Sequence, residues 1–160
     1  MIESNYVDSL ANDDFDHAVS KGFWQRWLRR LTRKPNRLLS FKEVTRRKRL
    51  LGQRSLGVMT VAVEYIVGSV GRADDFDASF LPRNEHVLER WRRIDRAWRA
   101  GEYLPPIELY KVGDQYFVVD GNHRVSVAHA QGQDYIDADV TEIDLRTLTS
   151  EIPVVKPSEN

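Results

Sequence analysis

The hydrophobic and polar positions in the second half of the chain predict strands and helices that follow one another in a compact domain. Residues 58–67 are rich in Val and Ile and predict a strand, after which residues 68–72 form a glycine loop. Residues 86–100 repeat apolar side chains at helical spacing, and Gly101 is a natural residue just beyond a helix end.

Two further strands are predicted at residues 107–112 and 115–119, joined by the two-residue hairpin turn Gly113-Asp114. A helix should follow over residues 122–131. Residues 136–143 then alternate apolar and polar positions, which is typical of a strand with one buried face.

The order of these elements predicts an α+β fold, in which a small mixed sheet with packed helices occupies residues 58–145. Residues 1–57 should precede it as an acidic arm and a basic helical extension. Residues 146–160 should follow it as a tail that contains two prolines.

The extension carries two helix signals. Residues 22–34 place Trp and Leu on one face and arginines on the other, which is typical of an amphipathic basic helix. We expect its apolar face to pack on the domain or on a second copy, with nucleic-acid contact and a membrane-surface position as alternatives. Ser40 and Glu43 form a capping-box pattern, so a second helix should run to about Leu51 and close at Gly52.

Charge is balanced overall but unevenly distributed, since 24 Lys+Arg match 24 Asp+Glu. Residues 1–20 carry five carboxylates and no Lys or Arg, whereas residues 21–54 carry thirteen Lys or Arg and one acidic residue. Such asymmetry indicates either an anionic partner for the basic segment or an acidic arm that folds back on it. The plainer interpretation is that the basic residues form a helix face in contact with solvent. The densest cations, for which we predict contact with DNA or RNA, are Arg46, Arg47, Lys48 and Arg49.

The absence of cysteine excludes disulfides and thiolate chemistry from the functions of this chain. The sequence has no apolar run long enough to span a membrane, and its acidic beginning lacks the apolar stretch of a secretion signal. We therefore expect a cytoplasmic protein with no membrane partner.

Chemically useful side chains gather where the strand at 115–119 gives way to the next helix. A strand, a tight turn and a helix N-terminus together present backbone N–H groups and a positive dipole, which suit a phosphate. A turn alone does not require Asp, Gly, Asn, His and Arg side by side. The predicted phosphate ligands are Gly121, Asn122, His123, Arg124 and Ser126, with Arg72 approaching from the glycine loop.

If a bound phosphate is transferred, the candidate acid and base residues are Asp120, His123 and Glu64. Each has a plainer interpretation. Asp120 caps the helix, Arg124 pairs with Asp120 or with a carboxylate of the last strand, and His123 is a packed neutral histidine. The remaining histidines lack the spacing of metal ligands, so no metal site is predicted.

Residues 61–143 resemble the ParB/sulfiredoxin superfamily. VAVEYIVGSVGR (residues 61–72) is similar to its opening strand and arginine-bearing loop, and LERWRRIDRAWRAGEYLPPIEL (residues 88–109) is similar to its helix, glycine and proline-led strand. VVDGNHRVSVAHAQG takes the position of the phosphate-binding motif. ParB proteins have G-E-R-R there and sulfiredoxins have G-C-H-R, where this chain has Gly121-Asn122-His123-Arg124.

The resemblance implies a ParB/sulfiredoxin-like fold with a nucleotide or phosphate site. Asn122 stands where sulfiredoxins carry their catalytic cysteine, so sulfiredoxin chemistry is excluded. The second nucleotide motif and the helix-turn-helix of ParB proteins have no counterpart here, so centromere clamping is not expected.

The leading hypothesis is a protein that binds CTP, ATP or ADP, with Mg²⁺ as a candidate companion, and acts with nucleic acid through its basic helices. The first alternative is an enzyme, either a phosphotransferase similar to the free-serine kinase that shares this fold or a nucleotide hydrolase. The second alternative is a DNA- or RNA-binding regulatory protein that uses the domain as a scaffold. A homodimer is a further candidate.

Overall fold

The computed structural model describes residues 37–147. Over this range the chain forms six strands, three α-helices and two short 3-10 turns. Their bounds are β1 (Leu39–Ser40), α2 (Phe41–Thr45), β2 (Lys48–Ala62), η1 (Val63–Tyr65), β3 (Ile66–Ser69), η2 (Glu85–Val87), α3 (Leu88–Arg99), β4 (Ile107–Val112), β5 (Gln115–Asp120), α4 (Asn122–Ala130) and β6 (Tyr135–Thr147).

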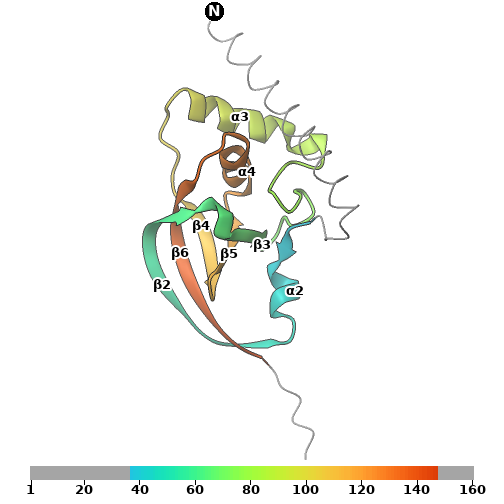
Figure 1. Cartoon of the computed structure of the whole chain (residues 1–160), viewed down its shortest axis with the longest axis vertical. Coiled ribbons are helices and arrows are strands. Elements are labelled where there is room, and N and C mark those ends of the chain that lie inside the picture. The colour runs from blue at the N-terminus through green and yellow to red at the C-terminus, as the bar shows by residue number, and fades with distance from the viewer. Residues whose placement is uncertain (1–36, 148–160) are drawn as a thin grey trace, which may run out of the picture.

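All six strands join one mixed sheet in the order β1-β3-β5-β4-β6-β2. The β4–β5 hairpin and the β2–β6 pair are antiparallel, whereas β1–β3, β3–β5 and β4–β6 are parallel. Figure 1 shows α3 and α4 together at one end of this sheet, with α2 near its other end. The predicted α+β class, with a small mixed sheet and packed helices, is confirmed.

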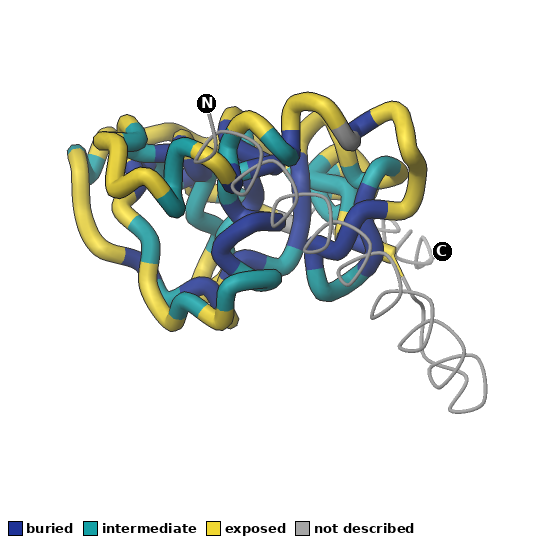
Figure 2. The backbone as a smooth tube through the Cα atoms, turned by 90° about the horizontal axis from the view of Figure 1, so that it is seen from above, coloured by how far each residue is buried: buried dark blue, intermediate teal, exposed yellow. Residues whose placement is uncertain are grey.

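The core lies where α4 meets the middle of the sheet. Val125 of α4 packs with Val118 of β5 and Val140 of β6, and all three are fully buried. Neighbouring residues of a strand face opposite sides, so Phe117 instead contacts the ring of Phe41 in α2, with centroids 5.5 Å apart. Figure 2 shows the buried backbone gathered in the middle of the molecule, between exposed outer stretches.

A second cluster fixes α3 against α4. Trp91 is fully buried and packs with Val87 and Val127, and Trp98 lies partly buried against the same cluster. The two tryptophans of α3 are therefore core residues, as their shared stripe predicts. The predicted hairpin and helix ends are confirmed as well, since Gly101, Gly113 and Gly132 all adopt positive φ angles at turns or helix ends.

The helix predicted to run to Leu51 is wrong. Helix α2 ends at Thr45, and no side-chain hydrogen bond caps it at Ser40. The carboxylate of Glu43 accepts hydrogen bonds from Arg37 Nη2 at 3.1 and 2.9 Å instead of completing a capping box. Residues from Lys48 onward belong to β2, because they pair with the distant strand β6. Tertiary pairing overrides the local helix signal here.

Some predicted segments lie outside the described residues. These are the acidic arm of residues 1–20, the amphipathic helix of residues 22–34 and the tail beyond residue 147. Within residues 37–147, the sheet includes chain that precedes Val58, namely β1 and the first part of β2. No helix in this range is long and apolar enough to cross a membrane.

One glycine of the predicted loop has a packing role. A Cβ atom built on Gly68 would lie 2.3 Å from the carbonyl oxygen of Leu39 and 2.6 Å from the ring of Phe117. Gly68 therefore lets β1 and the buried ring approach β3, rather than opening the backbone to a ligand.

We predict that Gly68→Ala lowers the free energy of unfolding by roughly 1–3 kcal/mol, because the added methyl group overpacks this contact. Urea denaturation of the purified variant measures the change. The matched control is Gly71→Ala, where an added Cβ meets nothing within 4 Å, and its stability should stay within about 0.5 kcal/mol of the parent. Equal effects of the two substitutions would contradict the packing role.

Candidate functional site

The corner between β5 and α4 depends on a glycine in a left-handed conformation. Gly121 is the N-cap residue of α4, with φ +106° and ψ +19°. A Cβ atom there would lie 2.4 Å from Cγ2 of Ile107, so the position is closed to other residues on both conformational and steric grounds. No side chain caps the helix. The first turn of α4 therefore keeps backbone N–H groups without a capping side chain.

The guanidinium of Arg124 is occupied by the protein itself. Its Nη2 forms an ion pair with Oδ2 of Asp120 at 2.8 Å, and its Nη1 donates to the carbonyl oxygens of Pro105 and Pro106. Only 13% of the Arg124 side chain is exposed. This geometry favours a positioning role for Arg124 over the direct phosphate contact that we expected, and it shows Asp120 paired with Arg124 rather than capping the helix.

His123 lies buried in a strongly cationic environment. It is 5% exposed, and its ring packs edge-on against Phe76 with centroids 5.5 Å apart. The pKa of His123 is lowered to about 4, chiefly by burial and also by the positive charges of Arg90 and Arg72, which Asp75 partly opposes. His123 is therefore neutral at pH 7, as its plainer interpretation predicts.

Arg72 approaches the corner from the loop after β3, as predicted from the sequence. Its Nη1 pairs with Oδ2 of Asp75 at 3.0 Å, and its backbone N–H donates to Oγ of Ser69 at 3.1 Å. The ring nitrogen Nε2 of His86 lies 3.3 Å from the other Asp75 oxygen. Arg72 is 47% exposed, so its ion pair is a surface pair that contributes little stability and exchanges readily for another anion.

Arg90, in the first turn of α3, was missed by sequence reasoning. Its charge lowers the pKa of His123 more than that of any other side chain does. In the sequence, Arg90 is one of several arginines on an amphipathic helix, and nothing in the pattern singles it out. Only the packing of α3 on α4 distinguishes Arg90 from its neighbours.

Two adjacent buried side chains at the N-terminus of α4 have polar atoms without partners. Asn122 is 6% exposed, and neither its Oδ1 nor the Nδ1 of His123 has a hydrogen-bond partner among the described residues. Buried polar atoms are nearly always hydrogen-bonded in folded proteins. The backbone N–H groups at the start of α4 and a protonated Nδ1 of His123 can donate to an anion, whereas Oδ1 of Asn122 can only accept and needs a donor.

The remaining predicted residues lie elsewhere. Ser126 is fully buried, and its Oγ accepts a hydrogen bond from Nε1 of Trp91 at 3.1 Å. That bond and the burial favour a packing role over the expected phosphate contact. Glu64, in η1, lines a separate hollow with His129 and Asp134.

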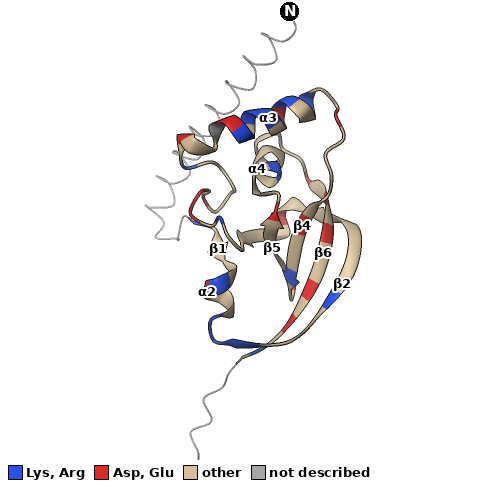
Figure 3. Ribbon diagram, turned by 180° about the vertical axis from the view of Figure 1, so that it is seen from behind, with Lys and Arg blue, Asp and Glu red and all other residues tan. Residues whose placement is uncertain are grey.

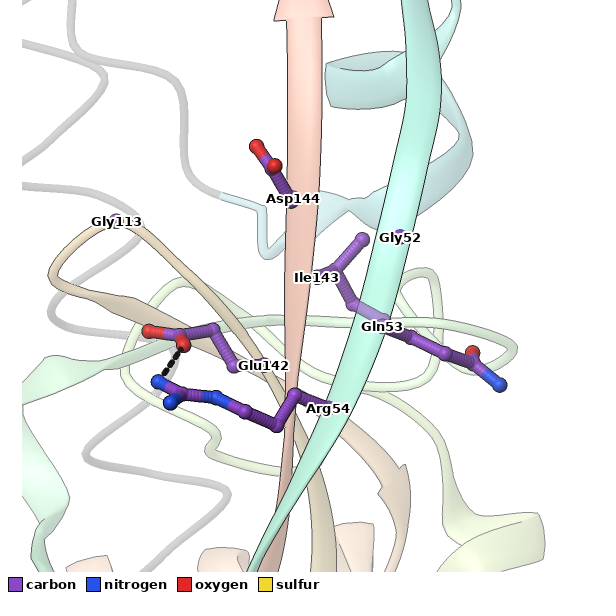
Figure 4. A pocket seen from close by; sticks show the side chains of 7 residues that line it. All are labelled: Gly52, Gln53, Arg54, Gly113, Glu142, Ile143 and Asp144. Atoms are coloured by element: carbon purple, nitrogen blue, oxygen red, sulfur yellow. Dashed lines mark hydrogen bonds and ion pairs between the residues drawn. The ribbon is translucent and has the colours of Figure 1, made fainter.

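A larger hollow of about 520 Å³ lies on the β2–β6 pair, away from the α4 corner (Figure 4). Glu142 in its wall accepts hydrogen bonds from Arg54 and Lys111, which hold the pKa of that carboxyl below its ordinary value. Two of its charged groups, Arg54 and Glu142, are thus paired with each other. Among residues 37–147 there is no group of three His, Asp or Glu placed to hold a metal ion.

The buried neutral state of His123 predicts a dependence of stability on pH. The pKa of His123 is about 4 in the folded protein against an ordinary value of 6.5, so the unfolded chain binds this proton more readily. Stability contributed by neutral His123 is present above pH 6.5 and is lost as the pH falls toward 4, by at most about 1.4 kcal/mol per unit.

Urea denaturation of the parent and of His123→Gln, between about pH 7 and pH 4.5, isolates this effect. The parent should lose stability relative to the variant as the pH falls. Parallel pH profiles would show that His123 is not the group responsible.

Comparison with known proteins gives similarity to solved structures alone. No family profile matches the chain, and no curated protein matches it. Among solved structures, it is similar to the sulfiredoxin of Arabidopsis thaliana, with 17% identity, a TM-score of 0.37, and coverage of 52% of this chain and 82% of that chain.

Proposed function

We propose that the α4 corner binds the phosphate groups of a nucleotide, with CTP, ATP and ADP as the candidates. One observation carries the proposal. Asn122 and His123 are both more than nine-tenths buried, and each leaves a polar atom without a partner at the uncapped start of α4. A phosphate offers several strong acceptor oxygens to the backbone N–H groups and to Nδ1 of His123 when that atom carries a proton. Oδ1 of Asn122 is an acceptor, so it would take a donor of the same ligand, such as a hydroxyl group.

The surrounding charge favours an anion. The N-terminus of a helix carries a partial positive charge, and Arg72 and Arg90 lie close enough to His123 to depress its pKa. A bound phosphate reverses this effect, because a negative charge favours the protonated form of the imidazole. His123 then supplies a donor at Nδ1 as well as at Nε2.

The residues of the corner divide into two roles. Arg72 and Arg90 are the side chains that recognise the anion. Arg72 holds only a surface ion pair, and the charges of both arginines lower the pKa of His123. Arg124 is a positioning residue, because its donors hold Asp120 and the two proline carbonyls in place.

Binding is better supported than turnover. The carboxylate of Asp120 is held by Arg124, and Glu64 lines a different hollow, so the two candidate bases do not converge on His123. A phosphotransferase or a hydrolase requires a base within hydrogen-bond reach of the attacking group.

Isothermal titration of the full chain with CTP, ATP, ADP and GTP tests the binding proposal. At least one nucleotide should bind, and Arg72→Gln or Arg90→Gln should weaken it by roughly tenfold or more through loss of a charge-assisted contact. The matched control Arg54→Gln removes an equal charge from β2, where Arg54 pairs with Glu142 at 2.7 Å, and should leave binding unchanged. No binding by any nucleotide would refute the proposal.

Phosphate release in the presence of Mg²⁺ separates binding from turnover. We predict that the nucleotide that binds stays intact during prolonged incubation, since neither Asp120 nor Glu64, the two predicted bases, is aligned with His123. A Mg²⁺-dependent release that Asp120→Asn abolishes would instead establish a hydrolase or phosphotransferase.

A further inference from the structure

A second cationic surface lies far from the α4 corner, at the end of the β2–β6 pair. We call it the ribbon tip and define it by Arg46, Arg47, Lys48, Arg49 and Arg146. The first four follow α2 into the start of β2, and the fifth comes from the end of β6. Figure 3 shows this turn as a continuous basic stretch below α2.

The strand register places two of these cations side by side. Arg49 is directly opposite Arg146 in the antiparallel pair, and both side chains are exposed. Like charges in directly opposed positions destabilise a sheet. This arrangement is recognisable only in the structure, because the sequence predicted a helix over Arg49.

Nearby carboxylates do not neutralise the ribbon tip. No ion pair joins any of its five cations to a described residue. Glu43 is bound by Arg37 at 2.9 Å, and Glu142 is bound by Arg54 and Lys111. Asp144 is the one acidic residue on β6 beyond Glu142 within the described range, and five cations outnumber it.

The ribbon tip belongs to a stretch with only two strands. Strand β4 pairs with β6 as far as Glu142, so residues 143–147 pair with β2 alone. Leu50 and Leu51 lie at the register shift that precedes Gly52, and they are 56% and 50% exposed. These apolar side chains are therefore not covered by the described part of the protein.

We propose that the ribbon tip binds the sugar–phosphate backbone of duplex DNA. The major groove of B-form DNA admits a two-stranded β-ribbon, and exposed arginines on both strands then meet phosphates. A-form RNA has a deep, narrow major groove that excludes such a ribbon. A membrane surface is the competing partner for a cationic segment with exposed leucines, and binding to vesicles distinguishes it from the duplex.

Fluorescence anisotropy with a labelled duplex of about 20 base pairs, over a series of NaCl concentrations, tests this proposal on the full chain. The parent should bind with an affinity that falls linearly against the logarithm of salt. The double variant Arg49→Gln with Arg146→Gln should bind about tenfold or more weakly, with a slope smaller by roughly 1 to 2.

The matched control is Arg83→Gln with Arg93→Gln, which removes the same charge from exposed positions outside the ribbon. It should retain the parent affinity and salt slope. Circular dichroism should show both double variants folded. Arg49→Gln with Arg146→Gln relieves a like-charge pair, and Arg83→Gln with Arg93→Gln changes exposed positions only. Leu50→Ser with Leu51→Ser should also keep duplex binding.

Several outcomes would overturn the proposal. The first is a parent chain that does not bind the duplex. The second is an unchanged affinity and slope in the Arg49 and Arg146 variant. The third is a parent that binds vesicles containing phosphatidylserine in preference to the duplex and loses that binding in the leucine variant.

Discussion

The bond network of Arg124 is the interaction on which the α4 corner depends. One guanidinium joins the end of β5, through Asp120, to the loop that leads into β4, through the carbonyls of Pro105 and Pro106. Because Arg124 itself sits in the first turn of α4, three segments are fixed by one side chain. Arg124 is 13% exposed, so its loss removes buried packing together with its hydrogen bonds, whereas the carboxylate of Asp120 is 57% exposed and can turn to water.

This fixed frame explains how two unsatisfied polar side chains persist at the start of α4. Gly121 holds its left-handed turn against Ile107, and Asn122 and His123 lie buried directly after it. The energetic disadvantage of their unpaired atoms is balanced by the packing of Val125 and Val127 further along the same helix. Functional sites commonly retain such local disadvantages because the surrounding fold over-determines them.

Local signals were sufficient for one part of the fold and insufficient for another. The β4–β5 hairpin, its Gly113 turn and the following helix were predictable because each depends on residues close together in the chain. The first part of strand β2, before Val58, was not, since its partner β6 lies far away in sequence, as the 88-residue separation between Arg54 and Glu142 shows. A capping-box pattern at Ser40 is informative only where no such partner competes.

The candidate site divides in the same way. Gly121 and His123 were predictable from the strand–turn–helix pattern, which fixes where a helix N-terminus lies. The partners of Arg124 and Ser126 were not, because they come from the loop before β4 and from Trp91 of α3. Which arginine faces His123 likewise depends on how α3 packs on α4. Sequence pattern located the corner, and tertiary packing assigned the side chains within it.

The position of β2 at the sheet edge has a consequence for solubility. An edge strand of fifteen residues exposes main-chain groups that can recruit a strand from another molecule and start aggregation. Two register shifts, near Gly52 and Gly57, interrupt the regular ladder of β2, and arginines and a lysine occupy its first positions. Charges and irregularities of this kind discourage edge-to-edge association. The basic start of β2 thus keeps individual molecules apart while its edge stays open.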